Sequence, residues 1–270
     1  MDIRFSAFFF GRNGLLALLT LLILTGPVGL CFSQELRIET EIFADDQEEP
    51  LSKTVTLFDS NTVYDFTENP PAIAVFRPPT ASHDGQFILL DLQSERRTEV
   101  STERITGLID KLVRWASDQK DPLLNFCADP QFEETFDKST GMLSLTSELW
   151  NYRVATVPAD DPTTLKRYRE FTDWYTRLNT MMNSTPPPGP RLELNKALEK
   201  HGVVPVEIQR TVDSSSSTLR AVHLITWRLS RADRARLEEA RHHLATFEKV
   251  DNAEFIAQQY ETNLVRGQSE

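Results

Sequence analysis

VTLFDSNTVYDF, at residues Val55–Phe66, contains two short runs rich in β-branched and aromatic side chains. Between the runs lies the polar segment Asp59-Ser60-Asn61. β-branched and aromatic residues favour strands, whereas Asp, Ser and Asn favour tight turns because their side chains bond to the local backbone. The segment therefore predicts an antiparallel β-hairpin with strands at 54–58 and 62–66.

Further strands are expected on both sides of this hairpin. Leu36, Ile38, Thr40 and Ile42 alternate with charged residues, and a period of two is typical of a half-buried strand. Runs of similar character predict strands at 72–77, 86–92, 98–100, 132–136, 142–146, 149–157, 203–212 and 218–229. The last two are the clearest hairpin, because a polar serine-rich loop joins them.

Helices are expected where apolar residues recur at steps of three and four. One such stripe runs from Ile105 to Ala116, after a start that Ser101 or Thr102 can cap. A second helix begins at Asp161 and carries a wide aromatic stripe as far as Met182. We interpret this stripe as part of the core rather than as a ligand-binding surface. Further helices are expected at 192–201, 231–249 and 252–262, and the less regular segment 121–130 is expected to hold one helical turn.

These elements predict an α+β protein whose antiparallel sheet is packed by helices on one face. We expect an α+β domain at 34–229, interrupted by a proline-rich connector at 184–190. The segment 230–270 is expected to hold C-terminal helices. They would either pack on the same domain or form an interaction tail.

The first residues differ in character from the rest of the chain. Arg4 and Arg12 precede the apolar run LLALLTLLIL at Leu15–Leu24, and Gly26-Pro27 would end a helix there. A basic start, a short apolar run and small residues near Ser33 are the three parts of a signal peptide. We therefore expect 1–33 to direct export to the periplasm or extracellular space. A retained anchor is the alternative, although the run is shorter than the roughly 20 residues of a membrane span. Contact with a membrane is expected only through the uncleaved signal peptide.

The charge balance argues against one class of partner. The chain has 270 residues, with 40 acidic against 29 basic side chains and a net charge of -11. Proteins that bind nucleic acid need basic surface to replace phosphate counterions, so no nucleic-acid partner is expected.

Motifs for catalysis or metal binding are scarce. No HExxH or paired-cysteine motif is present, so neither a metal nor another cofactor is expected. Cys127, beside Phe126, is better interpreted as a buried, inert thiol than as a nucleophile. His83, in a proline-flanked loop beside Asp84, is the one histidine that we consider a candidate for catalysis. The acidic run at Asp45-Asp46 lacks the ligand spacing of a calcium loop and is interpreted as a solvated turn. No catalytic residue is predicted.

Three pieces of the chain carry a resemblance: VTLFDSNTVYDF at Val55–Phe66, GQFILLD at Gly85–Asp91 and LSLTSELWNYRVAT at Leu143–Thr156. They look like segments of an uncharacterised family of exported bacterial proteins, and more loosely they resemble the periplasmic lipoprotein-carrier (LolA-like) fold. The resemblance implies a curved antiparallel sheet with helices over its concave side, a helical C-terminal tail, and non-catalytic binding of acyl chains. It covers about half of the exported chain and transfers no binding residue.

Three classes of function follow. A binding or carrier module for an apolar, lipid-like ligand, such as a lipid or lipoprotein, would use an apolar cavity lined by Trp150, Tyr152, Trp174 and Trp227. A structural or interaction module would bind another protein of the cell envelope through its acidic surface or C-terminal helices. A hydrolase would bring His83 or Cys127 within hydrogen-bond reach of a carboxylate.

Overall fold

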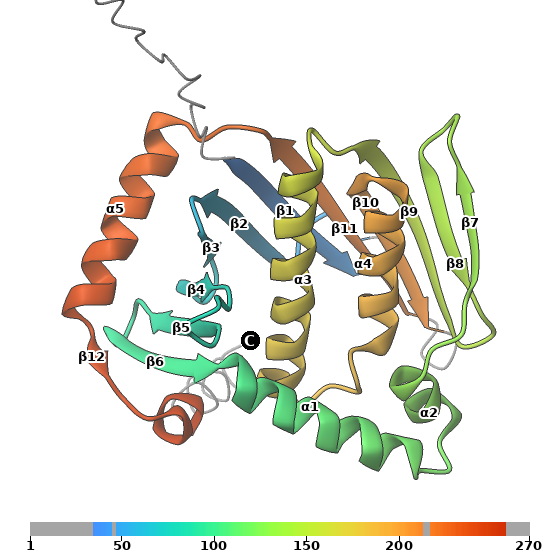
Figure 1. The fold of residues 1–270 in the computed structure, drawn as a ribbon, viewed down its shortest axis with the longest axis horizontal. Helices are drawn as coiled ribbons and strands as arrows, with labels where there is room; N and C mark the ends of the chain where they lie inside the picture. Colours follow the sequence, from blue (N-terminus) through green and yellow to red (C-terminus); the bar gives the residue numbers. More distant parts are fainter. Residues whose placement is uncertain (1–34, 45–46, 213–216, 258–270) are drawn as a thin grey trace, which may run out of the picture. The chain divides into compact units, whose positions relative to one another are not determined.

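The computed structural model describes residues 35–44, 47–212 and 217–257. Twelve strands in this part of the chain form one sheet, in the order β12-β6-β5-β4-β3-β2-β1-β11-β10-β9-β8-β7 (Figure 1). The strands are β1 Leu36–Ala44, β2 Ser52–Asp59, β3 Thr62–Thr67, β4 Ala72–Arg77, β5 Gln86–Asp91, β6 Arg96–Ser101, β7 Glu133–Asp137, β8 Met142–Thr146, β9 Trp150–Pro158, β10 Val203–Val212, β11 Ser217–Thr226 and β12 Glu248–Lys249. The helices are α1 Thr102–Ser117, α2 Pro122–Ala128, α3 Pro162–Asn183, α4 Gly189–His201 and α5 Arg231–Thr246.

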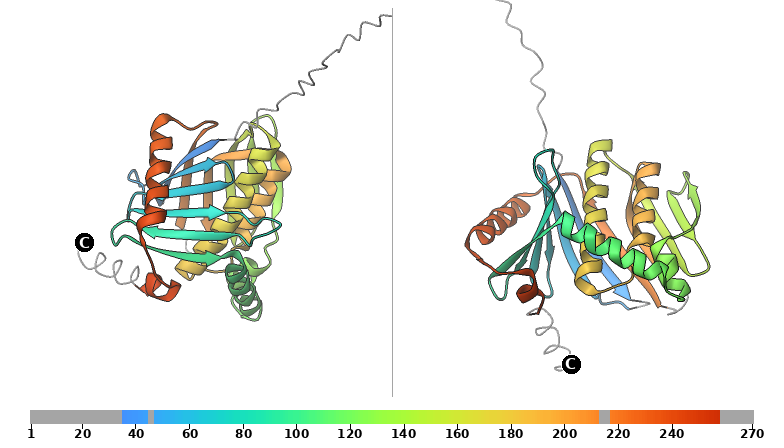
Figure 2. Two further views of the ribbon diagram at one scale, coloured as in Figure 1. Left: turned by 60° about the vertical axis from the view of Figure 1, so that its left-hand side comes forward. Right: turned by 60° about the horizontal axis from the view of Figure 1, so that its bottom comes forward.

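The predicted hairpin is confirmed as β2 and β3. Asp59 pairs with Thr62 across a two-residue turn, in which Ser60 has a positive φ of 48°. The other neighbouring strands are also antiparallel, apart from the parallel pair β12–β6. β1 lies between β2 and β11, so the first strand of the described chain joins the hairpin β10–β11 to the strands β2–β6. The sheet is curved and does not close on itself (Figure 2).

Helices α1, α3 and α4 lie on the concave side of the sheet (Figures 1 and 2). The aromatic stripe of α3 is largely core, as expected, because Tyr168, Phe171 and Leu178 are buried. The ring of Phe171 packs edge-on against Phe58 of β2, with centroids 5.6 Å apart. Together with residues of β1, β3, β4, β5, β6 and α1, these side chains form one apolar cluster beneath α1 and α3.

The first helix of the C-terminal segment, α5, lies on the opposite, convex side of the sheet (Figure 2), and a second helix begins at 252, as expected. Leu237 and Ala240 pack on a second cluster formed by the outward-facing side chains of β2–β5. Ser230 and Asp233 form the expected capping box, with each side chain bonded to the other residue's backbone N–H. The prediction of an α+β fold with a curved antiparallel sheet, helices on its concave face and a helical C-terminal segment is confirmed.

Several element boundaries differ from expectation by a few residues, and two of these differences have a clear structural reason. α5 ends at Thr246, three residues before the predicted end, because the chain turns there to pair β12 with β6. α4 begins at Gly189, inside the expected proline-rich connector. A Cβ at Gly189 would clash with the Cys127 carbonyl oxygen and Pro130, so glycine permits the close approach of α4 to α2.

Several predictions fall outside the part of the chain that the structure describes. They are the signal peptide at 1–33, the acidic turn at Asp45-Asp46 and the end of the last helix beyond 257. In the described ranges, no helix combines the length and apolar character needed to cross a membrane.

Candidate ligand-binding site

The four aromatic residues expected to line a cavity lie in two separate clusters. Trp150 and Tyr152 point from β9 into a third cluster, beneath α4, with ring centroids 6.1 Å apart. Tyr152 is buried against α4 residues such as Leu194 and Leu198, whereas Trp150 is only partly buried. This pair lies at the β9–β10 end of the concave face.

The other two aromatic residues lie against the cluster beneath α1 and α3. Trp174 of α3 and Trp227, which follows β11, are both partly buried there, and Met181, Met182 and Ile225 accompany them. The guanidinium of Arg177 lies 5.2 Å from the Trp174 ring centroid. The structure therefore brings the four residues together two by two rather than as one group. Large apolar side chains remain only partly covered at the edge of α3.

A buried carboxyl group also faces the concave side. Asp65 of β3 accepts hydrogen bonds from the hydroxyl groups of Thr56 and Tyr175, each at 2.6 Å. Burial raises the pKa of Asp65 above its ordinary value, and the two hydrogen bonds oppose that shift. Asp65 is thus enclosed and has its partners within the fold.

Neither candidate nucleophile or base lies in a catalytic arrangement. Cys127 is buried on α2, as expected, and burial raises the pKa of its thiol to about 11. Its thiol therefore stays protonated at neutral pH. His83 is exposed in its loop, where its backbone N–H donates to Thr80 Oγ1. In the described ranges no carboxylate bonds to either side chain. The hydrolase alternative thus lacks the residue pair that it needs.

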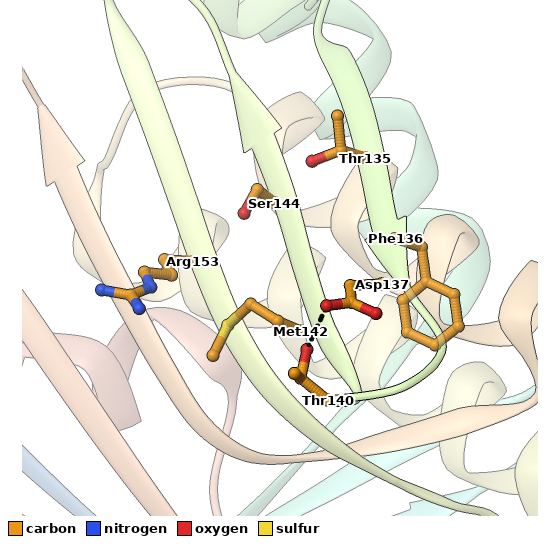
Figure 3. Close-up of a pocket in the computed structure, with 7 residues that line it drawn as sticks. All are labelled: Thr135, Phe136, Asp137, Thr140, Met142, Ser144 and Arg153. Carbon is orange, nitrogen blue, oxygen red and sulfur yellow. Dashed lines mark hydrogen bonds between the residues drawn. The ribbon is translucent and has the colours of Figure 1, made fainter.

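Two open cavities are found elsewhere on the molecule. One, of about 430 Å³, lies over β7–β9 and is lined by polar residues such as Asp137, Ser144 and Arg153 (Figure 3). Hydrogen bonds from Ser139 and Thr140 lower the pKa of Asp137 to about 2. This pKa shift is explained by the local turn alone.

The second cavity, of about 340 Å³, lies near the start of α5 and is lined partly by Arg37, Arg228 and Arg236. None of the four expected aromatic residues lines either cavity. Within the described ranges, no three His, Cys, Asp or Glu side chains are grouped so as to hold a metal ion.

Comparisons with known proteins were made with both the sequence and the structure. No protein-family model and no curated protein matches the chain. Among solved structures, the chain is similar to the LolA superfamily protein NE2245 from Nitrosomonas europaea. The match has 10% sequence identity, covers 74% of this chain and 88% of that one, and has a TM-score of 0.23. At this level the similarity assigns neither a family nor a ligand.

Two arginines on the concave side were missed by the sequence reasoning. Arg191 lies in the first turn of α4, and Arg210 lies on β10 opposite Tyr152. A signal for Arg210 exists in the sequence, since it alternates in phase with Ile208 and Val212, which are both buried. A cation at an inward-facing strand position is uncommon unless it is paired.

Proposed function

We propose that this protein is an exported, non-catalytic binding or carrier protein for an apolar, lipid-like ligand. The ligand lies on the concave side of the molecule, along α3 and toward α4. The observation that carries the proposal is the set of large apolar side chains that remain partly covered beside α3: Trp174, Met181, Met182, Ile225 and Trp227.

These side chains suit an apolar chain of variable shape. Methionine side chains are flexible and polarisable, so they adapt to irregular apolar groups. Indole rings add a large contact area with little conformational freedom to lose. Each ligand methylene that leaves water here would contribute about 0.8 kcal/mol, so an acyl chain can supply most of the binding energy.

Titration of the full-length protein with the neutral fluorescent probe 1-N-phenylnaphthylamine tests this proposal. We expect saturable binding that Trp174→Ala and Trp227→Ala each weaken by roughly tenfold, because each removes up to about 1.5 kcal/mol of apolar contact. Trp115→Ala is the matched control, since Trp115 is 51% exposed on α1 and lies outside the site. Absence of saturable binding, or equal weakening by the control, would contradict the proposal.

A structural or protein-interaction module of the cell envelope is the second candidate. It is favoured by apolar side chains exposed on the convex face, where Leu224 is 60% and Val157 is 37% exposed. The register of β1, β11, β10 and β9 places both residues on the face opposite Tyr152. Under this alternative, Leu224→Ser would abolish co-fractionation with envelope membranes and leave probe binding unchanged.

A further inference from the structure

Two cations face the concave side near the pair Trp150–Tyr152. The guanidinium of Arg210 lies 5.2 Å from the Trp150 ring centroid, and its residue pairs with Tyr152 across β9 and β10. Arg191 reaches the same region from α4, where Nε donates to Asn195 Oδ1 at 3.0 Å. The positive charges of both arginines act on the Tyr152 hydroxyl. Arg210 therefore lies beside Tyr152 in the sheet, and Arg191 approaches the same tyrosine from the first turn of α4.

Neither arginine forms an ion pair with any residue in the described ranges. The acid linked most directly to Arg191 is Asp173, which accepts from Asn195 Nδ2 at 2.8 Å and pairs with Arg169 at 3.5 Å. The chain as a whole carries eleven more acidic than basic side chains. Carboxylates are thus abundant in the chain, yet within the described ranges none of them pairs directly with Arg191 or Arg210.

Two buried nitrogen atoms in this region, Arg210 Nε and Trp150 Nε1, form no hydrogen bond of good geometry within the described ranges, although the Trp150 indole lies near the Tyr152 hydroxyl. A buried polar atom without a partner costs about 1–3 kcal/mol, so proteins rarely retain several in one place. An acceptor from outside the chain would satisfy them.

We infer that the ligand carries an anionic head group, a carboxylate or a phosphate, which Arg191 and Arg210 bind at the α4 end of the concave face. The inference rests on the proposed carrier function, because the apolar chain of the same ligand extends toward Trp174 and Trp227. Guanidinium groups match the planar geometry of such anions and can donate two parallel hydrogen bonds. The indole N–H of Trp150 completes the polar end.

Calorimetric titration of the full-length protein with oleate and oleyl alcohol tests the inference, because the two ligands share a chain and differ in charge. We expect oleate to bind at least about tenfold more tightly, since charged hydrogen bonds contribute about 1.5–3 kcal/mol. Arg210→Met and Arg191→Met should each remove most of this preference without changing the affinity for oleyl alcohol. That unchanged affinity also shows that a variant is folded.

Arg153→Met is the matched control. Arg153 lies next to Tyr152 on β9 but points to the opposite face, so its loss changes the net charge equally and should preserve the preference. Should Arg210→Met fail to fold, Arg191→Met decides by the same comparison. Acetate serves as the free anion and should not compete with oleate at equal concentration.

The outcomes separate the two proposals. Equal affinity of the wild type for both ligands overturns the head-group inference and leaves the carrier function in place. Binding of neither ligand overturns the carrier function and the inference with it. Competition by acetate as strong as by oleate, or equal loss in Arg153→Met, also overturns the inference, because the site would then respond to free anions or to net charge alone.

Discussion

The two ends of the concave face differ in whether their buried polar groups have hydrogen-bond partners. At the end beneath α1 and α3, Asp65 is enclosed by apolar side chains and accepts hydrogen bonds from Thr56 and Tyr175. At the end beneath α4, the buried Nε of Arg210 has no acceptor in the described chain. This difference fits the proposal that the first end is organised for stability and the second for a ligand.

The largest effect is expected in the apolar end. Phe171→Ala should lower the free energy of unfolding by about 3–5 kcal/mol, because the ring is buried and packs against Phe58, Phe76 and Tyr175. Urea denaturation measures the change. Leu108→Ala on the outer face of α1 is the control and should cost no more than about 0.5 kcal/mol. Equal costs in the two variants would mean that α3 does not pack as described.

The hydrogen bond of Tyr175 should contribute next. Tyr175→Phe leaves the Asp65 carboxyl with only the Thr56 hydroxyl as donor and should lower the free energy of unfolding by about 1–3 kcal/mol. Urea denaturation again provides the measurement, with Tyr175→Phe compared in the Asp65→Asn background. A loss of similar size in that background would show that the carboxylate is not what the hydroxyl stabilises.

The stability of the apolar end should depend on pH through Asp65. Because its pKa is raised in the folded state, the favourable contribution is complete below the ordinary pKa of 3.8 and declines as pH rises through the folded-state pKa. Asp65→Asn should therefore gain stability relative to wild type between about pH 4 and about pH 7. Thermal unfolding at the two pH values checks this. A difference that is constant, or that shrinks toward neutral pH, would contradict it.

The smallest effect on the free protein is expected at the other end. Arg210→Met removes a cation that has no ion pair with the residues the structure describes, so the free energy of unfolding should change by less than about 1 kcal/mol, or rise. Urea denaturation without added lipid measures it. A loss above about 2 kcal/mol would make Arg210 a structural residue like Asp65 and would erase the contrast between the two ends.

Local sequence patterns predicted most helices and strands, but they could not predict which strands pair when the partners lie far apart in the sequence. The strands at 72–77, 142–146 and 203–212 agree with β4, β8 and β10 because each depends on its own alternation and turns. The pairing of β1 with β11 spans most of the chain, and no local signal encodes it. Likewise, the apolar stripe of α5 shows that one side is buried but not which face of the sheet it covers.

The candidate site shows the same limit. Trp150 and Tyr152 are two residues apart on one strand, so their shared direction follows from strand geometry. Their separation from Trp174 and Trp227 depends on where α3 and α4 cross the sheet, which sequence spacing does not determine. Arg210 was overlooked because a single cation in an apolar alternation is easily taken for a solvated position.

Native mass spectrometry of the full-length protein, purified from its own host without detergent, tests the carrier account most directly. The account predicts a population heavier than the polypeptide by the mass of a lipid with an acidic head group. Arg210→Met should reduce that population, and Arg153→Met should not. A spectrum that contains only the mass of the bare polypeptide, from protein that also takes up no oleate, would contradict the account.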